Sequence, residues 1–347
     1  MPHSPTDSSM RRAWRKFAQN RRGYWSLILF GLLLLAALCS ELIANDRPLI
    51  VSYQNQFYVP VLKNYPETTF GGDFASFANY RDPYLADKIT QNGWMIWPPI
   101  KFANRTISNN PGQSYPARPS REHWLGTDDQ GRDILAQLLY GYRFSILFGL
   151  ALTTLSSAIG IMAGAIQGYL GGMTDLLLQR LIEIWSGMPH LFLLIILAAI
   201  IEPNFWWLLG LMTLFGWIGL VGVVRTEFVR ARNFDYVLAA RALGIAPLRI
   251  IFRHILPNAL VATVTFLPFI LNGSLTLLVS LDFLGFGLPP GSPSLGALLS
   301  QAKANIESPW IGLSIFGLLA VVLCLLIFIG EALRDAISER NLGAQPS

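Results

Sequence analysis

The stretch FSILFGLALTTLSSAIGIMAGAIQG, residues 144–168, carries no charged side chain. An α-helix of about 20 apolar residues crosses a hydrocarbon core of roughly 30 Å, so this stretch is predicted to be a transmembrane helix. Five further stretches share its length and apolar character: residues 25–44, 185–201, 205–224, 259–281 and 310–329. The predicted fold class is therefore an all-α polytopic membrane protein with six transmembrane helices.

The composition of the whole chain also favours a membrane protein. Hydrophobic residues make up 52% of the 347 residues and charged residues only 14%, outside the range of ordinary soluble domains. The net charge of +5 does not indicate nucleic-acid binding, because the basic residues cluster beside apolar spans, where they act as topology signals. Cys39 and Cys324 each lie within a long apolar run, which predicts neither a disulfide nor a metal site.

Clusters of basic residues predict how the chain is oriented. The segment before the first span is rich in them: Arg11, Arg12, Arg15, Lys16, Arg21 and Arg22. By the positive-inside rule the N-terminus faces the cytoplasm, and six crossings return the C-terminus there. The loop between the fourth and fifth spans is also basic, which places it on the same side.

The order of spans and loops predicts five segments. They are a basic cytoplasmic N-terminus (1–24), a retained anchor helix (25–44), an extracytoplasmic insertion (45–142), a transmembrane core (143–335) and a cytoplasmic tail (336–347). The anchor is not a cleaved signal peptide, because its apolar stretch is too long. The insertion is too polar to span a bilayer, so we expect a folded cap that serves docking or gating.

Two features of the spans concern packing and charge. Gly160, Gly164 and Gly168 recur every four residues, which predicts one helix face that another helix approaches closely. Asp282 ends an apolar run, and a carboxylate within a bilayer is a functional hypothesis by default. Gly285 and Gly287 follow it closely, so we expect Asp282 to lie where the helix leaves the membrane.

Sequence motifs of several enzyme classes are absent. No lysine follows a glycine in a GxxxxGK[ST] loop, so the chain itself is not expected to bind ATP in that manner. The four histidines lack HExxH spacing, and no serine stands in a GxSxG motif. We expect neither a hydrolase nor a metalloenzyme.

The loop between the fourth and fifth spans reads DYVLAARALGIAPLRIIFRHILPN, residues 235–258. Asp235 is predicted to cap a short helix rich in alanine, and Gly244 to end it in the left-handed conformation. Pro247 suits the first turn of a second helix, which Pro257 is expected to close. The prediction is a helix-turn-helix at the cytoplasmic membrane surface, although an interfacial connector would have similar features.

This loop resembles the EAA loop of ABC importer permeases, in which Glu-Ala-Ala is followed at fixed spacing by Gly and by Ile-x-Leu-Pro. Leu238 stands in place of the Glu and His254 in place of the Ile, whereas the remaining motif positions match: Ala239, Ala240, Gly244, Leu256 and Pro257. The resemblance implies that the loop couples to an ATPase. The residues expected to take part are Asp235, Leu238, Ala239, Ala240, Arg241, Gly244, Arg253, His254, Leu256 and Pro257.

Two further blocks are similar to C-type subunits of the dipeptide, oligopeptide and nickel permeases. Residues 123–133 contribute the motif positions Gly126, Thr127, Asp128, Gly131, Arg132 and Asp133. Residues 280–290 contribute Asp282, Gly285 and Gly287. Residues 20–25 and 40–45 resemble the inner-membrane permeases of microcin C importers, which implies oligopeptides and peptide-like compounds such as microcin C as substrates.

The resemblance also implies the partners and the location. A bacterial inner-membrane permease of this kind pairs with a second homologous permease, two cytoplasmic ATPase domains that bind ATP and Mg²⁺, and a periplasmic binding protein. The chain is then a transport subunit, not an enzyme, with no cofactor of its own. The alternatives are an ion-gradient-driven secondary transporter, which would want ionisable residues within the spans, and a membrane scaffold.

Overall fold

The computed structural model describes residues 9–108, 114–200, 204–289 and 291–342. Three described helices are each long and apolar enough to cross a membrane: α2 (Arg21–Leu38), α5 (Ile134–Leu170) and α15 (Pro309–Leu342). Residues 1–8, 109–113, 201–203, 290 and 343–347 of the predicted segments lie outside the described residues.

Three pairs of consecutive helices reach membrane-spanning length only together. They are α6 (Gly172–Ser186) with α7 (His190–Ile200), bent by 75°, α8 (Phe205–Gly216) with α9 (Ile218–Ala231), bent by 43°, and the helix over Pro247–Val264 with α13 (Leu267–Phe283), bent by 58°. Counting each bent pair as one span makes six spans. The predicted polytopic helical fold is confirmed, but three of its spans are not single straight helices.

The bends have local causes that the apolar patterns did not reveal. A continuous helix was expected over 185–201, but it breaks between Ser186 and His190, where Pro189 has no N–H to donate and disfavours helical geometry at Met188. The expected span 259–281 bends just before Pro268 for the same reason. Proline therefore divides spans that are apolar throughout.

The central helix α5 begins at Ile134, earlier than the expected Phe144, so the predicted insertion boundary at residue 142 falls inside this helix. Asp133 caps it: its Oδ1 accepts a hydrogen bond of 2.8 Å from the N–H of Ala136. The C-terminal boundary also shifts, because α15 continues to Leu342 through the predicted tail.

The predicted glycine face of α5 is confirmed as a close seam with α9. A Cβ atom added at Gly160 would lie 2.4 Å from the carbonyl oxygen of Trp217. At Gly164 it would lie 2.8 Å from the carbonyl oxygen of Val221. Any larger residue would therefore force the two helices apart.

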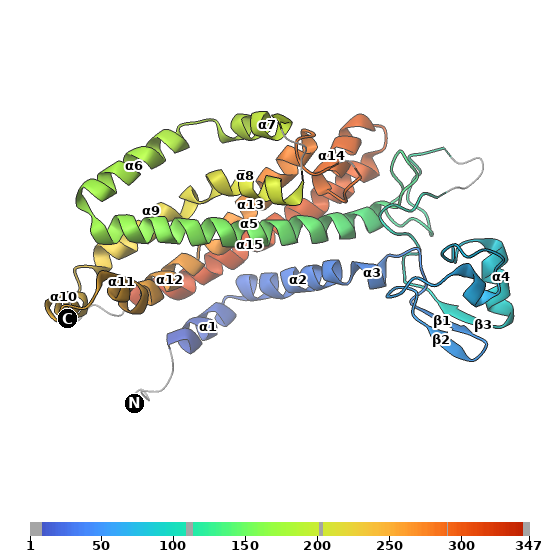
Figure 1. Cartoon of the computed structure of the whole chain (residues 1–347), viewed down its shortest axis with the longest axis horizontal. Helices are drawn as coiled ribbons and strands as arrows, with labels where there is room; N and C mark the ends of the chain where they lie inside the picture. Colours follow the sequence, from blue (N-terminus) through green and yellow to red (C-terminus); the bar gives the residue numbers. More distant parts are fainter. Residues whose placement is uncertain (1–8, 109–113, 201–203, 290, 343–347) are drawn as a thin grey trace.

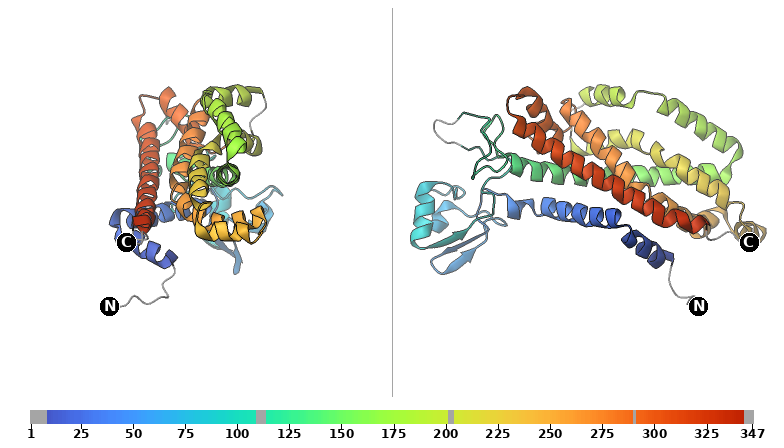
Figure 2. Two further views of the ribbon diagram at one scale, coloured as in Figure 1. Left: turned by 90° about the vertical axis from the view of Figure 1, so that its left-hand side faces the viewer. Right: turned by 180° about the vertical axis from the view of Figure 1, so that it is seen from behind.

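The other long helices complete the bundle (Figures 1 and 2). α2 packs on α15, and α13 contacts three helices: α5, α15 and α14 (Leu295–Ala304). These helices share one apolar core, which includes Ile146, Leu271, Leu275, Ile315 and Val322. We call the two ends of the bundle the insertion end and the terminal end. Figure 1 shows the insertion at one and α1 (Ser9–Gln19) with α10 (Asp235–Ala242) at the other.

The insertion is a folded unit with a small sheet that the sequence analysis did not predict. The chain leaves α2 through the short helix α3 (Ser40–Ile43). Strands β1 (Ile50–Tyr53), β2 (Gln56–Tyr58) and β3 (Gly93–Ile96) form an antiparallel sheet in the order β2-β1-β3. Its core also draws on a 3-10 turn (Glu67–Phe70) and on α4 (Pro83–Gln91), and its buried residues are Val51, Tyr53, Phe70, Tyr80, Leu85 and Ile89.

Candidate functional site

The loop with the Ala-Ala-x-x-x-Gly pattern forms a helix-turn-helix at the terminal end. Helix α10 ends in a turn at Gly244, whose φ of 70° is left-handed, as predicted. The N–H of Gly244 donates to the carbonyl of Arg241 (2.9 Å), and the N–H of Ile245 donates to that of Ala240 (3.1 Å). This pair of bonds is a Schellman motif, which needs the left-handed residue. The glycine therefore has a backbone role.

Asp235 is not the helix cap that the sequence analysis predicted. Phe234 occupies the capping position, and no side chain caps this helix end. Asp235 is the first residue of α10, where a carboxylate still interacts favourably with the helix dipole. The chain therefore enters α10 one residue earlier than expected, from an extended Phe234.

The second helix begins as predicted and ends differently. Pro247 occupies the first position of α11 (Pro247–Ile250). Pro257 was expected to end this helix, but the chain stays helical through a π-helical turn (Ile251–Ile255) into α12 (Leu256–Val264). A widened turn accommodates a residue that lacks an N–H donor. The loop is therefore continuous with the fifth span, so a displacement of α11 reaches α12 directly.

The two alanines of the motif have different surroundings. Ala240 is only 5% exposed and packs in a core within this chain, whereas Ala239 is exposed. That core joins the helix-turn-helix to α5 and α9; its members include Tyr169, Val224, Phe228, Val237, Ile250 and Ile255. Of the two alanines expected to take part in coupling, Ala239 is therefore at the surface, whereas the small size of Ala240 serves packing within this chain.

The outer surface of the helix-turn-helix is apolar. Leu243 is 80% exposed and Leu248 is 68% exposed, and Leu238 and Phe252 are exposed beside them in the sequence of the loop. Four large apolar side chains on one short loop are typical of a protein contact surface. Leu238, which replaces the glutamate of the motif, adds to this apolar surface.

The same loop also carries basic residues. The guanidinium of Arg241 lies 4.6 Å from the centre of the Tyr169 ring, so this residue also ties α10 to α5. Arg249 and Arg253 are exposed, whereas His254 and Leu256 are half-buried. The loop can therefore offer a partner both apolar contacts and positive charge.

A partly buried ion pair beside this loop was not found from the sequence. Asp175 of α6 accepts hydrogen bonds from Nε and Nη2 of Arg225 in α9, at 2.6 and 2.7 Å. The amide of Gln167 donates to the carbonyl of Asp175 (3.2 Å), and Arg232 donates to that of Gly168 (3.2 Å). These bonds fix the ends of α5, α6 and α9 together. The sequence shows only that Asp175 and Arg225 are charged residues beside apolar spans. That does not indicate that they pair with each other across 50 residues.

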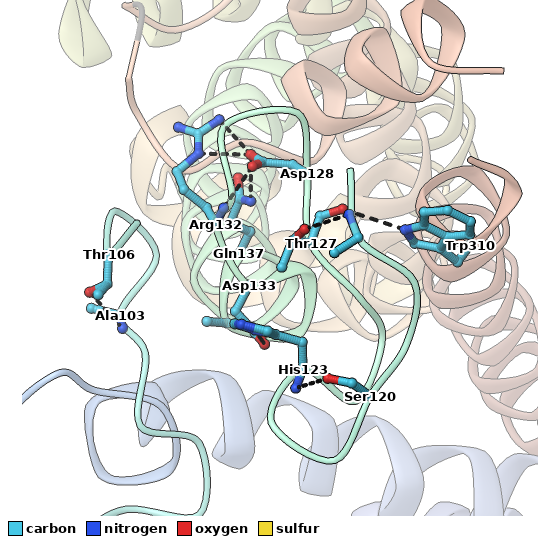
Figure 3. A network of polar contacts seen from close by, with 12 residues as sticks. Ala103, Thr106, Ser120, His123, Thr127, Asp128, Arg132, Asp133, Gln137 and Trp310 are labelled. Carbon is cyan, nitrogen blue, oxygen red and sulfur yellow. Dashed lines mark hydrogen bonds and ion pairs between the residues drawn. The ribbon is translucent and has the colours of Figure 1, made fainter. Parts of the chain in front are cut away.

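The motif at 123–133 forms a network at the insertion end (Figure 3). Asp128 is fully buried, and its Oδ1 accepts the N–H groups of Gln130 (2.9 Å) and Arg132 (2.8 Å). Its Oδ2 accepts hydrogen bonds from Nε of Arg132 at 2.7 Å and from Nε2 of Gln137 in α5 at 2.9 Å, and it forms an ion pair with Nη2 of Arg132 at 2.7 Å. One carboxylate thus holds a loop closed on the first turn of the central helix.

A second part of the same network holds the capping residue of α5. Oδ2 of Asp133 lies 2.8 Å from Nδ1 of the buried His123. Thr127 exchanges hydrogen bonds with the backbone of Ala117 and accepts one from the indole of Trp310 in α15. Gly126 and Gly131 both have positive φ, which lets the chain turn tightly around these groups. The motif is therefore a structural clip.

The motif at 280–290 is also structural. Asp282 is buried at the end of α13, where its carboxylate accepts the N–H of Leu288 (2.7 Å) and the hydroxyl of Ser294 (2.5 Å). A Cβ added at Gly287 would lie 1.6 Å from Oδ1 of Asp282. Gly285 has a φ of 83° and allows the chain to turn back. The carboxylate thus organises the end of α13.

Comparison with known proteins connects these motifs to one family. Residues 156–341 match the model described as binding-protein-dependent transport system inner membrane component, and residues 8–63 match the N-terminal TM domain of oligopeptide transport permease C.

Individual relatives agree with the family match. The chain is 59% identical to the inner membrane ABC transporter permease protein YejE of Escherichia coli (strain K12), over 94% of this chain and 96% of the relative. It is 52% identical to the peptidoglycan transport system permease protein YejE of Agrobacterium fabrum, over 97% and 94%. The oligopeptide transport system permease protein OppC of Haemophilus influenzae is 36% identical over 65% of this chain and 73% of the relative. The chain therefore belongs to the family of binding-protein-dependent inner membrane components, the permease subunits of ABC importers.

Proposed function

We propose that this permease imports oligopeptides and peptide-like compounds, among them microcin C, across the bacterial inner membrane. Its family assigns ATP hydrolysis to a separate ATPase and substrate delivery to a binding protein, so this chain acts in transport and not in catalysis. The peptide substrate is supported by the relatives whose names specify oligopeptide or peptidoglycan transport.

The observation that carries the mechanism is the apolar surface of the helix-turn-helix above its own buried core. Leu243 and Leu248 protrude from the loop, while Ala240 and Ile250 bind it firmly to α5 and α9. A partner that grips the exposed leucines therefore moves the core beneath them as one body. In the proposed mechanism, closure of the ATPase domains moves this loop and shifts the bundle between inward-open and outward-open states.

A second, homologous permease is proposed to cover α6 and α7. No described residue of α6 is buried, and its large apolar side chains are exposed: Met173, Leu176, Leu177, Leu181 and Ile184. Figure 1 shows α6 and α7 arching away from the rest of the bundle. α6 is held to its own chain mainly by polar contacts, such as those of Asp175 with Arg225 and Gln167, so its apolar face is available for another subunit.

The orientation and the role of the insertion complete the proposal. We place the terminal end in the cytoplasm, because the basic segment before α2 and the basic loop at α10 lie at that end (Figure 1). The insertion then faces the periplasm as a docking or gating cap. Its sheet packs α4 on one face and exposes Phe57, Trp94 and Ile96 from two edge strands, which supports a contact surface there.

The coupling surface is tested by changing exposed residues rather than buried ones. Ala239→Arg and the double change Leu243→Ser with Leu248→Ser alter the outer surface, whereas Ala240→Arg would disrupt the internal core and so confound the result. The matched control is Ala304→Arg, at an exposed position of α14 near the insertion end. Each variant is purified with its partner subunits.

Three measurements then decide the outcome: the amount of ATPase subunit retained, hydrolysis stimulated by the binding protein, and uptake of labelled peptide. We expect the loop variants to insert normally but to lose retained ATPase subunit or stimulated hydrolysis, together with uptake. The control should keep all three. Loop variants that match the control in all three measurements would refute the coupling role.

A further inference from the structure

The chain begins with a separate amphipathic helix whose role no coupling or transport step requires. Helix α1 (Ser9–Gln19) precedes α2, and Figure 1 shows it turning out of the line of α2. Between them, the side chain of Asn20 caps α2 by accepting the N–H of Gly23 at 3.2 Å. The break is thus built into the sequence, so α1 is not an extension of the first span.

One edge of α1 is fixed to the bundle. Phe17 is 2% exposed and packs against Ala332 and Ala336 near the end of α15. Gly23 of α2 touches the same place, since a Cβ there would lie 2.1 Å from that of Ala332. These contacts hold α1 at the end of the first span, where a membrane surface would lie.

The aromatic residues around this anchor suit a lipid interface. Trp14 is 55% exposed and stacks on Phe17 with ring centres 5.6 Å apart. Trp25 is 65% exposed and Tyr24 is partly exposed, one turn into α2. Exposed tryptophan and tyrosine at the end of a membrane span are typical of the headgroup region, where their apolar rings lie beside hydrocarbon and their polar groups beside water.

The charge of the segment has one sign. Six basic and no acidic residues lie between positions 9 and 25. At about 100° per residue, positions 11, 12, 15 and 16 fall roughly 100° to 160° around the helix axis from Phe17. They therefore lie away from the anchored edge. The neighbouring end of α15 adds Glu331, Asp335 and Glu339 against Arg334 and Arg340 in the sequence, so positive charge remains in large excess.

We propose that α1 is an interfacial helix that binds the headgroups of anionic phospholipids. The helix positions of Arg11, Arg12, Arg15 and Lys16 lie on the side of the phosphates, while Trp14 enters the acyl boundary. This arrangement is that of amphipathic helices rich in Lys and Arg on one face and carrying Trp or Phe on the other. Soluble phosphate would satisfy the charge but not the exposed tryptophans, so the ligand is a lipid. The proposal rests on the cytoplasmic placement of the terminal end.

The test uses the full chain with its partner subunits in lipid nanodiscs. An environment-sensitive fluorophore is attached to a single cysteine at Trp14→Cys, so that its apolar rings take the place of the indole, with Cys39 and Cys324 replaced by serine. Nanodiscs contain either phosphatidylcholine alone or phosphatidylcholine with phosphatidylglycerol, each with brominated acyl chains as quenchers. Each basic residue near an anionic surface contributes about a fivefold factor in binding.

We expect bromine quenching at position 14 to be at least about twofold stronger in the phosphatidylglycerol discs, and 0.5 M salt to abolish the difference. Arg11, Arg12, Arg15 and Lys16 changed together to Gln should remove the preference. A control with the same loss of charge changes Lys63, Lys101, Arg118 and Arg121, all at the insertion end, to Gln and should keep it.

Two results would overturn the proposal: equal quenching in both lipids, or a preference that survives in the α1 variant. Peptide uptake and ATPase retention are measured on the same samples. Because the fluorescence reports only on α1, failure of the lipid proposal is distinguishable from failure of the transport function.

Discussion

Replacing Asp128 by Asn should destabilise the insertion end of the bundle more than any other change of one charge in that loop. The carboxylate of Asp128 is fully buried and accepts two backbone N–H groups on Oδ1 and two side-chain N–H groups on Oδ2, which also pairs with Nη2 of Arg132. An asparagine presents an NH₂ group in place of one oxygen. In either orientation of the amide group, its NH₂ faces at least two N–H donors that a carboxylate oxygen accepts in the native protein.

The stability lost on replacing Asp128 by Asn can be worked out from those contacts. Each hydrogen bond to a charged group contributes about 1.5–3 kcal/mol, so losing two costs about 3–6 kcal/mol. The side chain of Arg132 is only 16% exposed, and its guanidinium would lose its counter-charge. Breaking a buried pair on one side costs about 3–5 kcal/mol, in agreement with the bond count.

The neighbouring residue Asp129 supplies a matched control, because it lies on the surface and Asp129→Asn removes the same charge. Thermal unfolding of the purified complex, followed by size-exclusion chromatography of heated samples, should show a large loss for the Asp128 variant. The control should change by less than about 0.5 kcal/mol. Limited proteolysis should cut residues 114–133 faster only in the Asp128 variant. Equal melting temperatures and equal cleavage of the two variants would refute the structural role of the clip.

Three further predictions follow from other parts of the molecule. Gly164→Leu should separate α5 from α9 and lower thermal stability by about 1–3 kcal/mol, whereas Gly222→Leu, where an added Cβ meets nothing, should melt like the wild type. Burial raises the pKa of Tyr80, so the insertion should lose stability as pH rises above about 10, and Tyr80→Phe should remove this loss in proteolysis assays between pH 8 and 11. Single cysteines at Gln19 and Thr68 should differ in labelling by an impermeant thiol reagent on cells with a permeabilised outer barrier; labelling of the first and protection of the second would reverse the topology.

Several parts of the site were predictable because their causes are local in sequence. An apolar run long enough to span a bilayer can be recognised from the sequence directly. The same is true of a helix face with a glycine at every fourth residue. Gly244 was correctly placed in a left-handed turn, since an alanine-rich helix followed by glycine needs no distant partner to end there. The spacing of the motifs resembles that of ABC importer permeases, and the match to the family model confirmed this assignment.

The sequence by itself determined the membrane class, the spans, the basic ends and the chemistry that the loop offers to a partner. Only the tertiary structure decided which of the two alanines faces outward, because Ala239 and Ala240 are chemically identical and differ only in what packs against them. The same holds for Asp175 with Arg225, which lie on separate helices, and for the contacts of Asp128, which form only when its loop folds back on the start of α5. Helix formation depends on neighbours in the chain, whereas burial and pairing depend on neighbours in space, and these become known only when the helices meet.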